Sequence, residues 1–254
     1  MAAILPASQH PTPRFALDHQ AHNVNGKPDA RPLSAEELLA ALHSKFSANF
    51  SNTRTIHSLA GTLEARARAL SLAGKRLDSL AGDAIHQHEL AKYIDEIFGD
   101  SMCATYLSCC GLDVAARMLL RRSLELGLVV AAYWDAPVDF WNWREHDGDI
   151  RFTTLCAYIE SDGYTTLCRK QGKSEEVDVK PTIKTLERLY SVLSNVVHPK
   201  PYNFSTTQER MYTADPEEVR KTLGYAVETQ QIIATILCWR FPDFNDILTS
   251  APKK

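Results

Sequence analysis

Residues 112–134, LDVAARMLLRRSLELGLVVAAYW, end in the longest apolar run of the chain, and their pattern decides the fold class. Apolar side chains recur here at steps of three and four residues, at positions 112, 116, 119, 126, 130 and 133. This period places them on one face of an α-helix that packs against a core. We expect the helix to start near Asp100 or Ser101, which can cap it, and to continue to about Trp134. The stretch therefore predicts an all-α protein, a helical bundle around one long apolar central helix.

The chain before the central helix predicts an arm followed by a helical domain. Residues 1–33 carry five of the twelve prolines and three histidines, with little periodic apolar content. Such a segment does not build a core, so we expect an extended or mobile arm. Ser34 and Glu37 have the spacing of a capping box, which marks a helix start. We therefore expect one helical domain over residues 34–254.

Helix-start and helix-stop residues divide the rest of the chain. Asp135 followed by Pro137 indicates that the central helix stops and that a short aromatic helix begins. Pro181 opens a later helix, which is predicted to stop at His198 because the sequence PKP follows. Residues 146–181 fit a helix, a strand or a small hairpin, and these alternatives stay open. Further helices are expected over residues 54–80, 83–98 (stopping at Gly99), 181–198 and 215–240.

The composition is that of an ordinary globular protein, with 44% hydrophobic and 23% charged residues. The formal net charge of −3 supplies no general attraction for nucleic acid, so a nucleic-acid role requires a local basic patch. The apolar run at 123–134 is too short to span a membrane, and the first residues, MAAILPASQHPTPR, lack the pattern of a secretory signal. We therefore expect a cytoplasmic protein without a membrane segment.

The cysteine and histidine pattern gives no support for a metal or a cofactor. The six cysteines contain no C-x-x-C pair, so we expect reduced thiols in the core. His86 and His88 are two residues apart on a predicted helix, which turns their rings to different sides. No phosphate-binding loop, dinucleotide fingerprint or HExxH motif occurs. We expect neither a metal site nor a cofactor.

A charged stripe lies on the predicted central helix. Asp113, Arg117, Arg121 and Glu125 are spaced four apart, and Arg122 can also reach Glu125. Apolar residues flank the stripe on both sides, so its charges are expected to be partly buried and to need partners. One interpretation is two ion pairs within the helix, Asp113–Arg117 and Arg121–Glu125, at a packed interface. The other is a site in which the arginines face an anion such as phosphate.

A second polar group lies near the end of the predicted 181–198 helix, in the sequence YSVLSNVVHPKPY of residues 190–202. Ser194 and His198 are four apart on one face, and Asn195 lies between them. A histidine with a near-neutral pKa can act as general acid or base, and an asparagine can position a phosphate. The structural alternative is that His198 and Asn195 only terminate the helix.

These residues resemble the HEPN motif, which ends a helix in helical nucleotide-binding domains, many of them RNases of toxin–antitoxin and phage-defence systems. The motif has an arginine, commonly followed by asparagine, and a histidine a few residues later. Asn195 and His198 match the asparagine and the histidine, whereas Ser194 stands in place of the arginine. The segment LLRRSLELGLVVAAYW is also similar to an uncharacterised bacterial helical family, which pairs an arginine and a glutamate on one helix with a later LS…H motif. The resemblance covers roughly residues 100–205.

The resemblance implies a bacterial stress or anti-phage protein that binds or cleaves RNA, as a metal-independent endoribonuclease if it is an enzyme. His198 would be the acid/base, Asn195 its positioning neighbour, and Arg121, with Arg122 and Arg188 as alternatives, the cation that replaces the missing arginine. In the second family the matching positions are Arg121 or Arg122, Glu125, Leu193, Ser194 and His198. The residues expected to line the binding site are Arg117, Arg122, Glu125, Tyr190, Ser194 and Tyr202. Family sites commonly form across a dimer, so we also expect a homodimer.

A non-catalytic interaction module is the competing hypothesis. In that case the bundle presents its aromatic region or its arm to a partner protein, and the charged stripe fixes the packing. The aromatic region consists of Trp134, Phe140, Trp141 and Trp143. Ser194 in place of arginine and the negative net charge favour this hypothesis. The two hypotheses differ in whether the motif histidine lies in an open, charged cleft with an arginine nearby.

Overall fold

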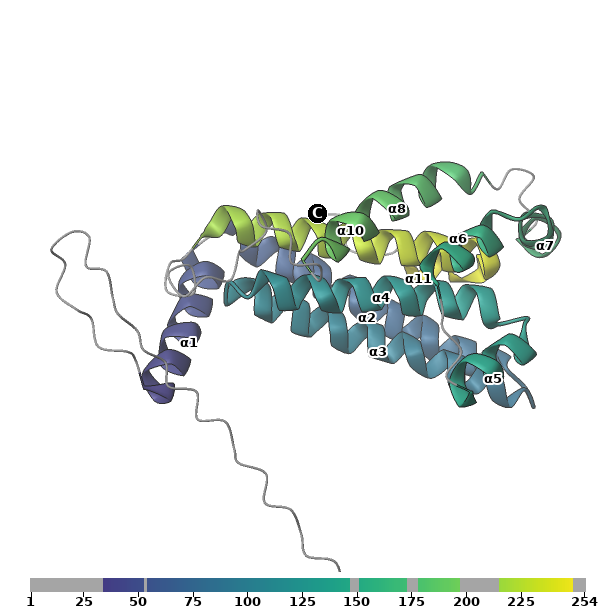
Figure 1. Ribbon diagram of the computed structural model, residues 1–254, viewed down its shortest axis with the longest axis horizontal. Helices are drawn as coiled ribbons and strands as arrows, with labels where there is room; N and C mark the ends of the chain where they lie inside the picture. Colours follow the sequence, from purple (N-terminus) through teal and green to yellow (C-terminus); the bar gives the residue numbers. More distant parts are fainter. Residues whose placement is uncertain (1–33, 53, 147–150, 173–177, 197–214, 249–254) are drawn as a thin grey trace, which may run out of the picture.

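The computed structural model describes residues 34–52, 54–146, 151–172, 178–196 and 215–248. In these ranges the chain forms ten α-helices and one short 3-10 helix, and no strand. The all-α prediction is thereby confirmed for the described part of the chain. No helix in this part is both long and apolar enough to cross a membrane. Figure 1 shows long helices lying side by side, with shorter helices at their ends and along one side.

Four long helices form the body of the bundle. They are α2 (Arg54–Leu80), α3 (Ile85–Cys109), α4 (Asp113–Tyr133) and α10 (Pro216–Arg240). α3 and α10 each lie against both α2 and α4. The buried apolar side chains of these helices belong to one continuous core, to which α5, α6 and α8 also contribute.

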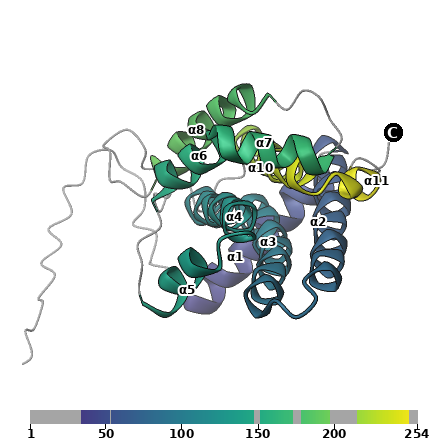
Figure 2. The same cartoon turned by 90° about the vertical axis from the view of Figure 1, so that its right-hand side faces the viewer.

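Shorter helices cover the ends and one side of this body (Figures 1 and 2). α8 packs along α4 and α10, and α6 packs on α4 and α8. α5 contacts α3 and α4 at one end of the bundle, whereas α1 extends away from the opposite end. The bounds are α1 Ala35–Asn52, α5 Pro137–Glu145, α6 Phe152–Glu160, α7 Asp162–Gly172, α8 Lys180–Ser194 and α11 Asn245–Leu248, with the 3-10 helix at Pro242–Phe244.

The prediction of a single helix over residues 100–134 is wrong, because the chain turns at Gly111 between α3 and α4. Gly111 has a φ of +73°, a conformation that glycine adopts without a steric penalty. Its N–H donates to the carbonyl of Ser108 (2.9 Å), and the N–H of Leu112 donates to that of Leu107 (2.8 Å). This pair of bonds is a Schellman motif, which ends α3.

Gly99, at which the sequence predicts a helix end, instead lies inside α3. A side chain at Gly99 would meet nothing within 4 Å, so glycine at this exposed position lowers only the helix propensity, by roughly 1 kcal/mol. The long apolar helix of the prediction is therefore replaced by two helices, of 25 and 21 residues. Along the first part of α4 the charged stripe runs beside buried apolar residues, whereas residues 126–132 are all buried.

Two predicted helix starts are confirmed by their capping bonds. At α1, the N–H of Ser34 donates to Oε2 of Glu37 (2.8 Å), and the N–H of Glu37 donates to Oγ of Ser34 (3.2 Å). At α10, the carboxylate of Asp215 accepts two N–H groups of the first turn (3.1 and 3.2 Å). Each cap satisfies backbone donors that have no partner within the helix. α2 also has the bounds that the sequence predicts.

The stretch of residues 146–181, for which the sequence leaves several structures open, contains α6 and α7 in its described part. The next helix, α8, has Pro181 in its first turn as predicted, but it ends at Ser194 rather than at His198. Pro199 has no N–H to close a helical bond to the carbonyl four residues earlier, so the last predicted turn loses a hydrogen bond. Residues 195 and 196 form a turn instead.

The turn between α2 and α3 is closed by a histidine. Nδ1 of His88 lies 2.7 Å from Oδ1 of Asp78, and its Nε2 lies 2.8 Å from the carbonyl oxygen of Gly82. Both neighbours are acceptors, so the arrangement favours the imidazolium, in which both ring nitrogens donate. The hydrogen bond to Asp78, followed by the bond to Gly82, raises the pKa of His88 above its usual 6.5.

We expect the stability difference between the wild type and His88→Gln to shrink as the pH rises. Because folding raises the pKa of His88, its contribution is full below about pH 6.5 and is lost as the pH passes the raised value. The measurement is the melting temperature of both proteins at about pH 5.5 and about pH 8.5. A difference that stays constant or grows at the higher pH would contradict the imidazolium assignment.

Candidate functional site

The charged stripe of α4 and its neighbour Arg122 include three arginines with different partners. Arg117 is the most buried of the three. Its Nη2 lies 2.5 Å from Oε1 of Glu218 on α10 and 3.6 Å from Oδ2 of Asp113, one turn earlier on α4. The guanidinium also lies over the ring of Tyr225, 5.4 Å from the centroid. The side chains of Arg117 and Asp113 are 12% and 6% exposed, so solvent screens this ion pair little.

Arg122 turns away from the stripe toward α3. Its Nη1 donates to both carboxylate oxygens of Asp100 (2.9 and 2.7 Å), and its Nη2 donates to Glu96 (2.8 Å). These bonds take the place of the contact with Glu125 that the spacing allows. Burial raises the pKa of the Asp100 carboxyl, although Arg122 opposes that shift. Arg122 therefore ties α4 to α3.

Arg121 and Glu125 join the stripe to α8. Nε of Arg121 donates to Oε1 of Glu125 (3.1 Å), and the hydroxyl of Tyr190 donates to the same oxygen (2.8 Å). The Arg121 guanidinium lies 4.9 Å from the centroid of the Tyr190 ring, on which Phe152 of α6 stacks at 3.6 Å. Burial, followed by the bond to Glu125, raises the pKa of Tyr190, so the phenol keeps its proton at neutral pH. We name Arg121, Glu125, Tyr190 and Phe152 the α4–α8 cluster.

The α4–α8 cluster is the part of the stripe that an anion can reach. The side chains of Arg121 and Glu125 are 28% and 36% exposed. Among the described residues Arg117 and Arg122 each pair with two carboxylates, whereas Arg121 pairs with one. A phosphate would therefore meet less competing negative charge at Arg121 than at the other two.

Part of this geometry follows from the sequence. Both ion pairs predicted within the helix are present, Asp113–Arg117 at 3.6 Å and Arg121–Glu125 at 3.1 Å. Sequence reasoning missed Phe152, because it lies in the stretch to which no element was assigned. The sequence gives one local indication of its role, which is that Phe152 is an aromatic residue at the start of the short apolar run FTTLCAYI.

The end of α8 places two motif residues one turn beyond Tyr190. Ser194 and Asn195 are both half-buried, and the N–H of Asn195 donates one turn back along α8 (3.1 Å). Oγ of Ser194 is buried and has no hydrogen-bond partner among the described residues. His198 and Tyr202 lie outside the described residues, so the shared face of Ser194 and His198 stays a prediction.

The aromatic region around α5 packs mainly into the core. Trp134 and Phe140 are 4% and 0% exposed. Trp141 and Trp143 are half-buried and make edge contacts with the Phe140 ring, at 4.9 and 6.1 Å between centroids. This arrangement is typical of core packing.

The buried cysteines are thiols with weak acidity. Burial raises the pKa of Cys156 to about 12 and that of Cys109 to about 11, so both keep their protons at neutral pH. All six cysteines are free of disulfides. Within the ranges that the structure describes, no group of three His, Cys, Asp or Glu side chains is arranged to hold a metal ion.

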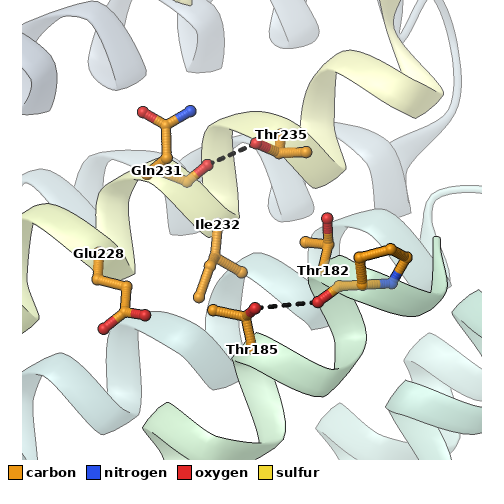
Figure 3. A pocket seen from close by; sticks show the side chains of 7 residues that line it. Thr182, Thr185, Glu228, Gln231, Ile232 and Thr235 are labelled. Atoms are coloured by element: carbon orange, nitrogen blue, oxygen red, sulfur yellow. Dashed lines mark hydrogen bonds between the residues drawn. The ribbon is translucent and has the colours of Figure 1, made fainter. Parts of the chain in front are cut away.

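A shallow groove runs between α8 and α10 (Figure 3). Its volume is about 240 Å³, and Thr185 of α8 and Ile232 of α10 lie at its centre. The hydroxyls of Thr185 and Thr235 donate to backbone carbonyls of their own helices (2.9 and 2.8 Å). The charged residue of the lining, Glu228, pairs with Arg188. The groove therefore offers few free polar groups and does not include the α4–α8 cluster.

The geometry thus defines one candidate site, the α4–α8 cluster beside the end of α8. It combines a half-exposed guanidinium, a carboxylate and a phenol from two helices, with an aromatic ring from a third. Neither a protein-family model, nor a curated protein, nor a solved structure matches this chain.

Proposed function

We propose that this chain is a HEPN-like protein that binds or cleaves RNA as a cytoplasmic homodimer in a bacterial stress or anti-phage setting. The observation that carries the proposal is the contact of Tyr190 with Arg121 and Glu125. The contact places Arg121 of α4 against α8, at a point one turn before the motif residues Ser194 and Asn195. Arg121 thereby becomes the candidate for the cation that the motif lacks at Ser194.

The proposed chemistry needs one proton acceptor and one cation. In metal-independent RNA cleavage a base removes the proton of a 2′-hydroxyl, that oxygen attacks the neighbouring phosphorus, and the bond from phosphorus to the 5′-oxygen breaks. The products are a 2′,3′-cyclic phosphate and a 5′-hydroxyl, whose oxygen takes its proton from water. His198 is the proposed base, because an imidazole is neutral in part at physiological pH. Arg121 is the proposed cation, which stabilises the charge that grows on the phosphate oxygens. Asn195 is proposed to position the phosphate.

Tyr190 and Glu125 are proposed to position Arg121 rather than to touch the substrate. The bond from Nε of Arg121 to Glu125 fixes the guanidinium plane, and the Tyr190 ring supports one face of it. A fixed guanidinium loses less side-chain entropy when a phosphate binds. Arg117 and Arg122 are proposed to stabilise the fold, since each already pairs with two carboxylates.

The test is cleavage of a single-stranded RNA, with a chelator present, by wild type, His198→Ala and Arg121→Ala. We expect the wild type to cleave and each variant to lose about 10²- to 10³-fold in rate, because each lacks one group that acts in the transition state. Arg68→Ala is the matched control, because Arg68 is exposed on α2 and, among the residues that the structure describes, pairs with a neighbour on its own helix. It should cleave as the wild type does.

Two outcomes would contradict the proposal. Cleavage that survives His198→Ala would remove the proposed base, and absence of both RNA binding and cleavage in the wild type would remove the function. Circular dichroism of each variant separates loss of activity from loss of fold.

The second candidate is a non-catalytic interaction module, and exposed apolar side chains favour it. Ile85 and Val138, at the starts of α3 and α5, are 67% and 71% exposed. Large apolar side chains exposed on a surface are a feature of interfaces when they gather into a patch. The same RNA experiment separates the two candidates, since an interaction module neither binds nor cleaves RNA.

A further inference from the structure

The first helix docks on the bundle through polar residues. Among the described side chains of α1, only Lys45 and Asn49 are buried, at 7% and 1% exposure. Leu39 is 66% exposed, and Phe46 and Phe50 pack against the core only in part. Figure 1 shows that much of α1 extends beyond the long helices. Burial of apolar surface therefore contributes less to the docking of α1 than to the other helices.

Lys45 and Asn49 both meet the turn between α3 and α4. Nδ2 of Asn49 donates to the carbonyl of Cys109 (2.8 Å), the last residue of α3. The Lys45 side chain passes directly over Gly111, where an added Cβ would lie 2.6 Å from Cε of the lysine. Glycine is thus required here by the backbone angle and by the approach of Lys45.

The surroundings of Lys45 act on the charge of its ammonium in opposite directions. Burial lowers the pKa of Lys45, whereas the carboxylates of Asp113 and Asp215, with the thiol of Cys110, oppose that shift. On α1 itself, Oδ1 of Asn49 is buried and has no hydrogen-bond partner among the described residues. Buried polar groups that lack partners destabilise the arrangement that buries them.

We propose that α1 is a releasable helix, held by the Lys45–Asn49 latch, that leaves the bundle while α2, α3, α4 and α10 stay folded. Its release exposes the thiol of Cys110 and the carboxylate of Asp113, which are 2% and 4% exposed when α1 is docked. Most of the stability of a helix in a protein comes from packing, so the released helix loses much of its amide protection. The proposed release of α1 does not depend on the RNA function proposed above.

Hydrogen exchange of the full chain, followed by mass spectrometry of its peptides, tests the release. We expect the amides of α1 to exchange at least tenfold faster than those of α4, because local opening requires less free energy than global unfolding. In Lys45→Met the carboxylates of Asp113 and Asp215 lose the ammonium that faces them, so α1 should exchange about a hundredfold faster than in the wild type. Peptides of α4 should keep the wild-type rate.

Lys92→Met is the matched control, since Lys92 is 65% exposed on α3 and pairs with a neighbour on its own helix. It should leave the exchange of α1 unchanged. Equal protection of α1 and α4 in the wild type would overturn the proposal. So would a Lys45→Met protein in which α1 is unaffected, or in which α1 and α4 accelerate equally.

Thiol labelling under native conditions gives a second readout. Cys110 lies beside the latch, whereas Cys156 and Cys168 are buried in α6 and α7, on the other side of the bundle body. We expect a maleimide to label Cys110 before these two, and Lys45→Met to accelerate labelling of Cys110 alone. Labelling of Cys110 at the same rate as Cys156 and Cys168 would mean that only global unfolding exposes it, and would refute the latch.

Discussion

Gly127→Val is expected to lower the free energy of unfolding by about 2 to 3 kcal/mol, because the variant overpacks the contact between α4 and α10. A Cβ at Gly127 would lie 2.9 Å from Cγ1 and 3.1 Å from Cγ2 of Ile233. Ile233 is 1% exposed and fixed in the core, so it has no room to move aside. The two helices would have to separate, and the rest of the interface would loosen. Urea unfolding followed by circular dichroism measures the loss.

Gly61→Ala is the matched control for this substitution. Gly61 also lies inside a long helix, α2, but a Cβ there would meet nothing within 4 Å. Alanine should therefore stabilise the protein by about 0.5 to 1 kcal/mol through helix propensity. A Gly127→Val protein as stable as the wild type would show that α4 and α10 do not approach as closely as the structure places them.

Arg117→Met is expected to cost about 3 kcal/mol, because it leaves a nearly buried carboxylate with one cation fewer. The partner Asp113 is 6% exposed, and Glu218 loses its contact with α4 as well. Methionine fills much of the same volume, so the loss reports the charge rather than a cavity. The measurement is again the midpoint of urea unfolding, read at neutral pH.

Arg68→Met provides the comparison for Arg117→Met. Arg68 makes a similar ion pair with Glu64, but its side chain is 67% exposed. Exposed pairs of this kind contribute about 0 to 1 kcal/mol, so the variant should be nearly as stable as the wild type. Equal losses in the two variants would mean that burial of the Asp113–Arg117 pair does not determine its contribution.

Helix starts could be predicted from the sequence because their causes are local. Ser34 with Glu37, and Asp215 with Pro216, satisfy the first backbone donors of their own helices, whatever the rest of the chain does. The break at Gly111 could not be predicted in this way. Gly99 and Gly111 both stand where a helix could end, and Gly111 is distinguished by its positive φ, the Schellman bonds and the approach of Lys45.

In the candidate site, too, the local contacts could be predicted from the sequence and the long-range contacts could not. The ion pairs of α4 connect residues four apart, so helical geometry alone predicts them. The bond from Tyr190 to Glu125 joins residues 65 apart, and the Phe152 contact needs a third helix. One sequence does not say which helices become neighbours, so the meeting of the two predicted groups had to come from the structure.

The four tryptophans of the chain have a spectroscopic consequence. Trp134, Trp141 and Trp143 lie at the junction of α4 and α5, and Trp239 lies in the last turn of α10. Figure 1 places these segments at the end of the bundle opposite α1. Tryptophan fluorescence therefore reports the state of this end of the molecule and not that of the other. An emission spectrum that stays native is fully compatible with a protein whose first helix has already come away.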